Sequence, residues 1–387
     1  MIGFRMPTRT HIEPGCFERL PEAARRIGIQ SALLVVDRGI RDNTRLLDQA
    51  VENLTATGLR VEVFDDVAPN PRTANVTEAA EVVRRAQLDG VIALGGGSVI
   101  DAAKAAAMLA TNTQRIEQYE GRDRYTNRPK PMIAIPTTCG TGSEVTWVSV
   151  LTHLPTQSKI SIKGETMFPD QALVDADLLQ TLPPELVAWT GLDALTHAVE
   201  CVTCLAANAV SDALAAQAVA LLFQYLPRAA ADIGGDAEAR EAVMRASTLA
   251  GLAFGNADVA AVHCLSEALG GLYDVPHGLA NAILLEPVMR HHRDAALEKL
   301  AWLDRSLRST VAGPADDLPQ AERADRFLDD LGTLCRRLKV PPFTSFDIDS
   351  ADFERIAAAA VRNGSNRSNP QPMSPTSYKT ILESLSA

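Results

Sequence analysis

The chain is predicted to combine an α/β N-terminal domain, built on a doubly wound and mostly parallel sheet, with an all-α C-terminal domain. Three observations lead to this fold class. Strand-like and helical segments alternate through the first half of the chain, glycine-rich loops follow two of the strand-like segments, and only helical patterns continue after residue 180. We therefore expect a dinucleotide-binding domain at residues 1–181 and a helical, metal-binding domain at residues 182–387.

The first domain is predicted from short apolar runs bounded by turn-forming residues. The strand candidates are 31–37, 61–67, 89–94, 131–135 and 171–175, and helices are expected near 41–57, 75–87 and 98–111. This alternation is typical of a parallel sheet with helices on both faces. Residues 149–163 resemble a hairpin with its turn at Pro155. Pro183 and Pro184 then open a run with helical spacing, which sets the domain boundary.

Two loops that follow predicted strands are rich in glycine and hydroxyl groups. Gly95-Gly96-Gly97-Ser98 lies between the strand 89–94 and an alanine-rich helix. Glycines there allow close backbone approach to a diphosphate, and the helix N-terminus favours negative charge. The loop has neither the G-x-G-x-x-G spacing nor the lysine of a P-loop. The second loop, PTTCGTGSE, starts at Pro136 after the strand 131–135 and suits polar contacts with a ligand.

Asp37 ends the predicted strand 31–37. A carboxylate at that position can accept hydrogen bonds from the adenosine ribose and repel a 2′-phosphate, which would favour NAD over NADP. It can equally be the N-cap of a following helix. The sequence leaves both interpretations open.

The helical half holds four residues that form a candidate metal site. Asp193 and His197 are four residues apart in TGLDALTHAVE, and that spacing places both side chains on one helical face. His263 and His277 follow in VHCLSEALGGLYDVPHG and can complete the site from a second helix and the turn after it. One carboxylate and three neutral imidazoles leave a dication with net positive charge, as a Lewis-acid catalyst requires.

Five stretches together resemble the iron-containing (group III) alcohol dehydrogenases, in the superfamily that also holds glycerol dehydrogenase and dehydroquinate synthase. They are PNPRTANV (69–76), GGGSVIDAAKA (95–105), PTTCGTGSEVT (136–146), LVDADLLQTLPPELVAWTGLDALTHAVE (173–200) and VHCLSEALGGLYDVPHGLANAI (262–283). They occur in the family's order and spread over most of the chain, which makes the resemblance highly specific.

The resemblance implies functional roles for particular residues. It implies that Asp193, His197, His263 and His277 bind the metal, with Fe(II) the first expectation and Zn the second. Around the dinucleotide it implies Asp37, Asn70, Gly96, Gly97, Ser98, Asp101, Thr137, Thr138, Thr141, Ser143 and Lys159. It also implies NAD rather than NADP as the cofactor, and a homodimer or larger homo-oligomer.

The chain departs from the family pattern at two positions. Glu267 stands where many members carry a second histidine near the nicotinamide, four residues after His263. We expect it to face the cleft, where it could relay protons, join the metal shell or bind a polar or cationic substrate group; a solvated glutamate without function is the other interpretation. Cys139 replaces a common alanine and is either a packing substitution or, if exposed, an oxidisable thiol.

Composition narrows the class of protein. The 387 residues include 46% hydrophobic and 22% charged residues, which is normal for a globular protein with a large core. The net charge of −11 argues against nucleic acid or an anionic membrane as the main partner. Six cysteines without a secreted spacing, and the lack of an evident signal or membrane-spanning segment, predict a cytoplasmic protein with reduced thiols.

The predicted function is an NAD-linked, metal-dependent dehydrogenase that interconverts an alcohol with its aldehyde or ketone in the interdomain cleft. A lyase of the dehydroquinate-synthase type is the first alternative, although the ligand segments lack the lysine and arginine it would need. A maleylacetate-reductase-like enzyme is the second, suggested by SNPQP at 368–372 but disfavoured by the intact ligand residues. A non-catalytic metal- or nucleotide-binding scaffold is the remote third.

Overall fold

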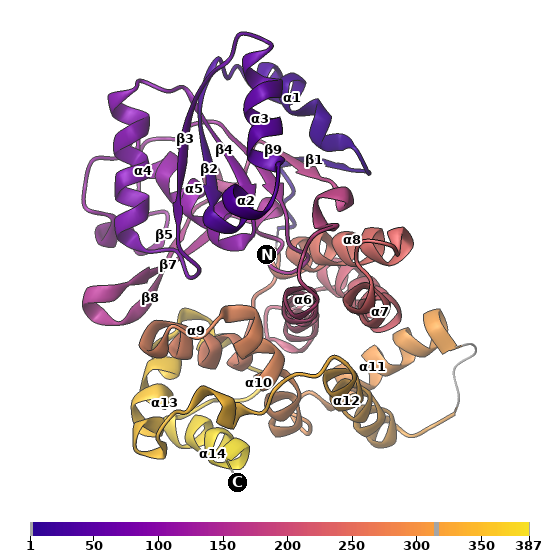
Figure 1. Ribbon diagram of the computed structural model, residues 1–387. Coiled ribbons are helices and arrows are strands. Elements are labelled where there is room, and N and C mark those ends of the chain that lie inside the picture. Colours follow the sequence, from indigo (N-terminus) through magenta and orange to yellow (C-terminus); the bar gives the residue numbers. More distant parts are fainter. Residues whose placement is uncertain (1–2, 313–316, 387) are drawn as a thin grey trace. The chain divides into compact units, whose positions relative to one another are not determined.

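The computed structural model describes residues 3–312 and 317–386. The chain from Arg5 to Leu182 forms one compact unit, and the chain from Pro183 onward forms another. The first unit contains the sheets with their covering helices, and the second is made of helices (Figure 1). The predicted combination of an α/β and a helical domain is therefore confirmed.

Six parallel strands form the main sheet, in the order β1-β9-β6-β4-β2-β3. They are β1 (Arg9–Ile12), β2 (Ser31–Asp37), β3 (Arg60–Val67), β4 (Gly90–Gly95), β6 (Met132–Pro136) and β9 (Gln171–Val174). Five of them coincide with the predicted strands to within a residue or two. The edge strand β1 is not predicted because its sequence, RTHI, has no apolar run; it forms by pairing with β9.

The helices of this unit are α1 (Leu20–Arg26), α2 (Arg38–Asn43), α3 (Leu46–Thr55), α4 (Thr73–Arg85) and α5 (Gly97–Leu109). The single helix expected near 41–57 is wrong, because Thr44 divides that segment into α2 and α3. The Thr44 hydroxyl donates to the carbonyl of Ile40 at 2.7 Å and accepts from the amide of Leu46 at 3.2 Å. It thereby ends one helix and starts the next.

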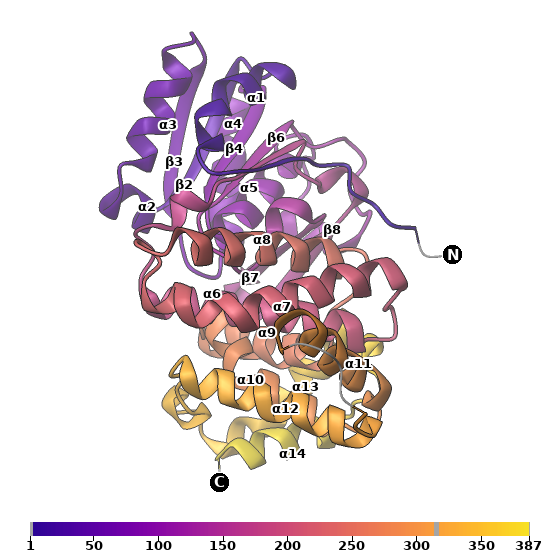
Figure 2. The ribbon, with the colours of Figure 1, turned by 90° about the vertical axis from the view of Figure 1, so that its right-hand side faces the viewer.

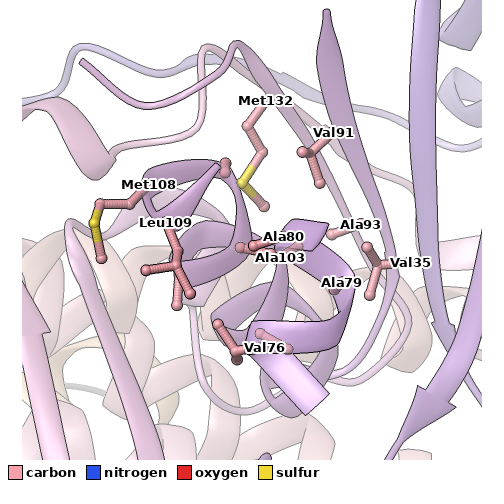
Figure 3. Close-up of a cluster of buried hydrophobic side chains, with 14 of the residues drawn as sticks. Val35, Val76, Ala79, Ala80, Val91, Ala93, Ala103, Met108, Leu109 and Met132 are labelled. Carbon is pink, nitrogen blue, oxygen red and sulfur yellow. The ribbon is translucent and has the colours of Figure 1, made fainter. Parts of the chain in front are cut away.

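Side chains that alternate along the strands build a separate core on each face of the sheet. On β4, Val91 and Ala93 pack on the side of α4 and α5, whereas Ile92 and Leu94 pack on the side of α1 and α3. Figure 3 shows the first of these cores, with Ala103 of α5 opposite the strand residues. Strands buried on both faces are expected for a parallel sheet between two helical layers.

A second, three-stranded sheet has the order β5-β8-β7, with β5 (Gly121–Arg122), β7 (Val148–His153) and β8 (Ser158–Lys163). Strands β7 and β8 are antiparallel and match the hairpin expected at 149–163. Their connection is a short 3₁₀ turn, Leu154–Thr156, followed by Gln157 in the left-handed region at φ 47°.

The helical unit consists of α6 (Pro184–Thr203), α7 (Ala209–Ala231), α8 (Ala237–Phe254), α9 (Ala261–Tyr273), α10 (His277–His291), α11 (Leu297–Leu307), α12 (Gln320–Arg337), α13 (Phe353–Arg362) and α14 (Pro375–Ser386). Helix α7 packs against α6 and α8, and α10 packs against α6 and α9 (Figure 2). Helix α13 lies against α9 and α14. Helix α6, which carries Asp193 and His197, therefore packs against α10, which carries His277.

Helix α7 is long and apolar enough to cross a membrane, with a mean hydropathy of 1.4, so the expectation that no segment reaches that length is wrong on this criterion. Core helices pass the same test. In this structure 39% of its apolar window is buried, and the helix packs against α6 and α8 through residues such as Ala215, Ala218 and Leu222.

A buried carboxylate joins α11 to α12 and should contribute strongly to stability. Asp304 accepts from Arg326 at 2.9 and 2.6 Å and lies 3.6 Å from Arg323, itself buried. Asp304→Asn should lower the free energy of unfolding by about 3 kcal/mol, because the buried Arg323 and the partly buried Arg326 lose the negative charge that they share. The matched change in the exposed Asp294–Arg293 pair should have little effect. Urea unfolding of both variants measures the difference, and equal losses would contradict the role given to burial.

Candidate metal centre and dinucleotide loops

Helix α6 presents three functional side chains on one face. Asp193, His197 and Glu200 are separated by four and three residues, which brings them to the same side of a helix. All three are buried, Glu200 completely. The first two are predicted from the sequence and Glu200 is not, although the D-x-x-x-H-x-x-E spacing is present in the chain.

The other two predicted ligands come from the starts of α9 and α10. His263 is the third residue of α9, and His277 is the first residue of α10. Gly278 lets the start of α10 approach the backbone of α6, because a Cβ atom at that position would lie 3.0 Å from the carbonyl oxygen of Trp189.

The structure brings these four side chains together. The ligand atoms of Asp193, His263 and His277 lie within 4.8 Å of one another, and His197 lies outside this set but next to it. His277 Nε2 is 3.6 Å from Asp193 Oδ1, and His197 Nε2 is 3.0 Å from His263 Nε2. Ligand atoms about 2.0–2.1 Å from one tetrahedral ion would be roughly 3.3 Å apart, so these separations suit a single cation.

Asn281 was not identified from the sequence, and its amide lies where the ligand atoms converge. Its Nδ2 donates to Asp193 Oδ1 at 2.6 Å and lies 3.3 Å from His263 Nε2 and 3.2 Å from His277 Nε2. Its buried Oδ1 has no hydrogen-bond partner among the described residues. Turning the amide over would direct that oxygen at a cation. The donor set and the orphaned oxygen both fit a divalent metal.

Glu200 fixes both the position and the tautomer of His263. Its carboxylate accepts from the amides of Ala260 at 2.9 Å and Val262 at 2.7 Å, at the start of α9, which has no side-chain cap of its own. It also lies 2.6 Å from His263 Nδ1. A proton on Nδ1 for this bond leaves the Nε2 lone pair for a metal.

Opposing effects act on the pKa of His263. Burial by itself lowers the pKa of His263, but the hydrogen bond to Glu200 and the negative charges of Glu200, Asp193 and Glu267 outweigh it and raise the pKa overall. The same negative field that favours a proton favours a metal cation at this position. On the other side, Phe254 stacks on His197 with ring centroids 4.2 Å apart and shields that imidazole from water.

Glu267 lies one helical turn beyond His263 on α9 and is half-buried. Its Oε2 accepts a hydrogen bond of 2.7 Å from Asn363 Nδ2. No hydrogen bond or ion pair among the described residues joins it to the four predicted ligands, so the geometry gives no support for a place in the metal shell. A held carboxylate is also unlike the freely solvated side chain considered from the sequence.

In the α/β unit, the two glycine-rich loops follow the neighbouring strands β4 and β6. The amide of Thr137 donates to the carbonyl of Gly95 at 3.1 Å. A Cβ atom on Gly96 would lie 3.0 Å from Thr138, and one on Gly97 would lie 2.4 Å from Thr141. The glycines are therefore required for the two loops to pack together. No side-chain cap covers the start of α5 after Gly96, and Ser98 lies in its first turn. Such a start fits a diphosphate.

A buried polar network supports the second loop. Lys104, 1% exposed, donates to Ser143 at 2.8 Å and to Thr146 at 3.0 Å. The Ser143 hydroxyl donates to Asp101 Oδ1 at 2.5 Å, and Asp101 Oδ2 accepts from the amide of Val150 at 2.8 Å. Burial lowers the pKa of Lys104 to about 8 and raises the pKa of Asp101. Asp101 and Ser143 are thus held in place by groups beneath the loop; Lys104 was not identified from the sequence.

The remaining predicted cofactor residues also have defined contacts. Asn70, with φ 54°, accepts from Lys159 Nζ at 2.7 Å, which joins two residues that are 89 positions apart. Asp37 is the N-cap of α2 and accepts from the amide of Ile40 at 2.9 Å. This satisfies one of its oxygens and leaves its preference for NAD a prediction. Cys139 is fully buried, which agrees with a packing substitution rather than an exposed thiol.

Comparison with known proteins covers nearly the whole chain. The family model described as iron-containing alcohol dehydrogenase matches residues 7–176, and the model for the C-terminal part of the Fe-containing alcohol dehydrogenase family matches residues 187–386. The chain is 36% identical to a 1,3-propanediol dehydrogenase of Klebsiella pneumoniae over 96% of its length and 95% of that protein. It is 33% identical to an NAD-dependent methanol dehydrogenase of Bacillus methanolicus, over 96% of each chain.

A solved structure of a 1,3-propanediol oxidoreductase has the same fold. It superposes with a TM-score of 0.93 at 35% sequence identity, over the full length of both chains.

The role of Glu200 can be tested by metal affinity. Glu200→Gln should weaken binding of Co(II) or Zn(II) about 10- to 100-fold, because the imidazole of His263 loses its orienting carboxylate. Competition with a chromophoric chelator measures the affinity, and the Co(II) visible spectrum reports the coordination geometry. Glu322→Gln, which removes an exposed carboxylate from α12 of the same unit, serves as the control. Equal affinities in the two variants would contradict the role of Glu200.

The buried Lys104 should make stability depend on pH. Its folded pKa of about 8 lies below the ordinary 10.5, so above pH 8 the unfolded chain holds this proton more tightly than the folded chain. Stability should therefore rise by about 2 kcal/mol from pH 8 to pH 10 through this group, and Lys104→Met should abolish that rise. Urea unfolding at pH 8, 9 and 10 tests this, with the exposed Lys339→Met as control. Parallel pH profiles for the wild type and Lys104→Met would contradict it.

Proposed function

Because this chain belongs to the iron-containing alcohol dehydrogenase family, we propose that it uses one Fe(II) ion, held by Asp193, His197, His263 and His277, to oxidise short alcohols with NAD. The family and the relatives support the coarser statement directly: the protein is an NAD-linked, metal-dependent oxidoreductase that interconverts an alcohol and its carbonyl compound. The convergence of Asp193, His263 and His277 on the Asn281 amide, with His197 beside His263, is the observation that carries the proposal.

The choice of Fe(II) rests on the family and on the donor set. Three imidazole nitrogens and one carboxylate oxygen form a donor set of borderline softness, which suits both Fe(II) and Zn. The family name favours iron, and Zn is the second candidate. The single carboxylate limits the charge of the ligand set and leaves a bound dication net positive.

The choice of NAD rests on the loops of the α/β unit. The uncapped start of α5 and the packed glycines suit the diphosphate. Asp37 at the end of β2 would disfavour a 2′-phosphate through like-charge repulsion. Its N-cap bond with Ile40 uses Oδ1 and leaves Oδ2 for a ribose hydroxyl.

When bound, the metal supplies Lewis acidity toward the substrate oxygen, and the nicotinamide accepts the hydride. The protein prepares both tasks. Glu200 holds the Nδ1 proton of His263, so that Nε2 keeps its lone pair. Ser266 lies 3.4 Å from His277 Nδ1 and orients that ring from the side away from the other ligands. Phe254 excludes water from the face of His197.

Short alcohols are the proposed substrates because the relatives point to them. One relative is named for 1,3-propanediol and another for methanol. Neither name fixes the substrate of this chain, because a single methylene in an apolar pocket changes discrimination by only about 1–3 kcal/mol.

A metal-controlled alcohol panel tests the proposal. Protein stripped of metal should form no NADH, and reloading with Fe(II) should restore NADH formation from ethanol, 1-butanol or 1,3-propanediol at pH 9, more than reloading with Zn(II). His263→Ala should lower kcat/KM by on the order of a thousandfold, because several kcal/mol of polarisation depend on the metal. NADP should serve less well than NAD.

The controls separate the parts of this proposal. The exposed Glu322→Gln variant should retain the wild-type rate. Higher activity with Zn(II) would replace iron while leaving the ligand set intact. Failure of every alcohol with metal demonstrably bound would overturn the proposed substrate class.

A further inference from the structure

We propose that Glu267 is a substrate-specificity residue that favours alcohols carrying an ammonium group two or three carbons from the hydroxyl. The inference rests on the proposed function, because it assigns a role at the same metal centre. It concerns the choice among substrates and leaves the chemistry of hydride transfer unchanged.

The position of Glu267 places its charge next to the metal ligands. It follows His263 by one turn of α9, so the Cβ atoms of the two residues should be about 5–6 Å apart. A spacer of two or three carbons is comparable with one helical turn, so a substrate could have its oxygen near the ligands and its ammonium near Glu267.

The Glu267 carboxylate has no cationic partner among the described residues. Its single hydrogen bond there comes from Asn363, and no lysine or arginine of those residues lies within ion-pair distance. A half-buried carboxylate with one neutral donor keeps most of its charge uncompensated. The buried carboxylate of Asp304, by contrast, is paired with Arg326. Glu267 therefore has negative charge available to bind a cation.

The carboxylate is also held in one place. Asn363, its donor, accepts from the amide of Ser365 at 2.9 Å through Oδ1. Ser365 and Ser368 in turn donate to Asp258 at 2.9 and 2.5 Å, which fastens this segment to the residues before α9. The segment that contains SNPQP thus serves to position Glu267. A preorganised carboxylate loses less entropy on binding a cation than a mobile one.

The charge of the whole centre points in the same direction. Asp193, Glu200 and Glu267 place three carboxylates at and beside the metal centre. No lysine or arginine is paired with any of the three within the part of the chain that the structure describes. Glu267 would attract an ammonium on the substrate and repel a carboxylate.

Matched substrates isolate the effect of charge. At pH 7.5, 3-amino-1-propanol is a cation, 1-butanol is its neutral analogue of nearly equal size, and 3-hydroxypropanoate is an anion. For the metal-loaded wild type and for Glu267→Gln, the specificity constant of each charged alcohol is divided by that of the neutral analogue. The glutamine keeps the size of the side chain and an oxygen that can accept from Asn363, so only the charge is removed.

We expect the ratio for 3-amino-1-propanol to fall about tenfold in Glu267→Gln and the ratio for 3-hydroxypropanoate to rise by a similar factor. Glu298→Gln removes an exposed carboxylate from α11 of the same unit and should leave both ratios unchanged. Should Glu267→Gln not fold, Glu267→Ser removes the same charge with less bulk. Ratios that do not move, in an enzyme that oxidises 1-butanol, would overturn the inference and leave the proposed function standing.

A binding measurement separates the inference from turnover. Propylammonium lacks a hydroxyl and cannot react, so its contact with the protein can be followed by saturation-transfer NMR. The wild type and Glu298→Gln should bind it, and Glu267→Gln should bind it several-fold more weakly. If no alcohol reacts, this comparison still decides the inference: equal binding by all three proteins overturns it. A kcat that falls equally for all substrates in Glu267→Gln, with unchanged ratios, would overturn it too and assign Glu267 to proton relay.

Discussion

The buried carboxylate of Glu200 is the interaction on which the metal centre depends. It joins α6 to the start of α9, where two backbone amides would otherwise be buried without partners, and the same oxygens fix His263. One side chain thus satisfies the backbone amides at the start of α9 and orients His263. Three charge-assisted hydrogen bonds compensate the cost of burying the charge, and they set the tautomer that a metal ligand needs.

The α/β unit meets a similar demand with glycine and a buried lysine. Gly96 and Gly97 have no Cβ atom, so the two loops can pack together. The start of α5 is therefore open to a phosphate. Lys104 then holds Ser143 and Thr146 from below, at the cost of a depressed pKa. The close packing of the two loops and the buried charge of Lys104 thus occur together where a ligand must approach the backbone closely.

Glu267 brings a negative charge next to the metal ligands without changing the elements that hold them. It lies on α9, one turn after His263. Asn363 holds it from a segment 96 residues away. The consequence is electrostatic. The fold keeps the metal centre, while the charge of Glu267 changes which substrates are preferred.

The sequence by itself determined the fold class and five of the six strands of the main sheet, because apolar periodicity is local. The D-x-x-x-H and glycine patterns pointed to a metal site and a phosphate loop, and the resemblance to a family implied the other residues expected around them. The sequence did not reveal β1, the break at Thr44, or the roles of Glu200, Asn281 and Lys104. Strand β1 forms only against β9, and the three side chains act through partners as much as 88 residues away. Tertiary structure decided these features, because hydrogen bonds between distant segments leave no periodic trace in the chain.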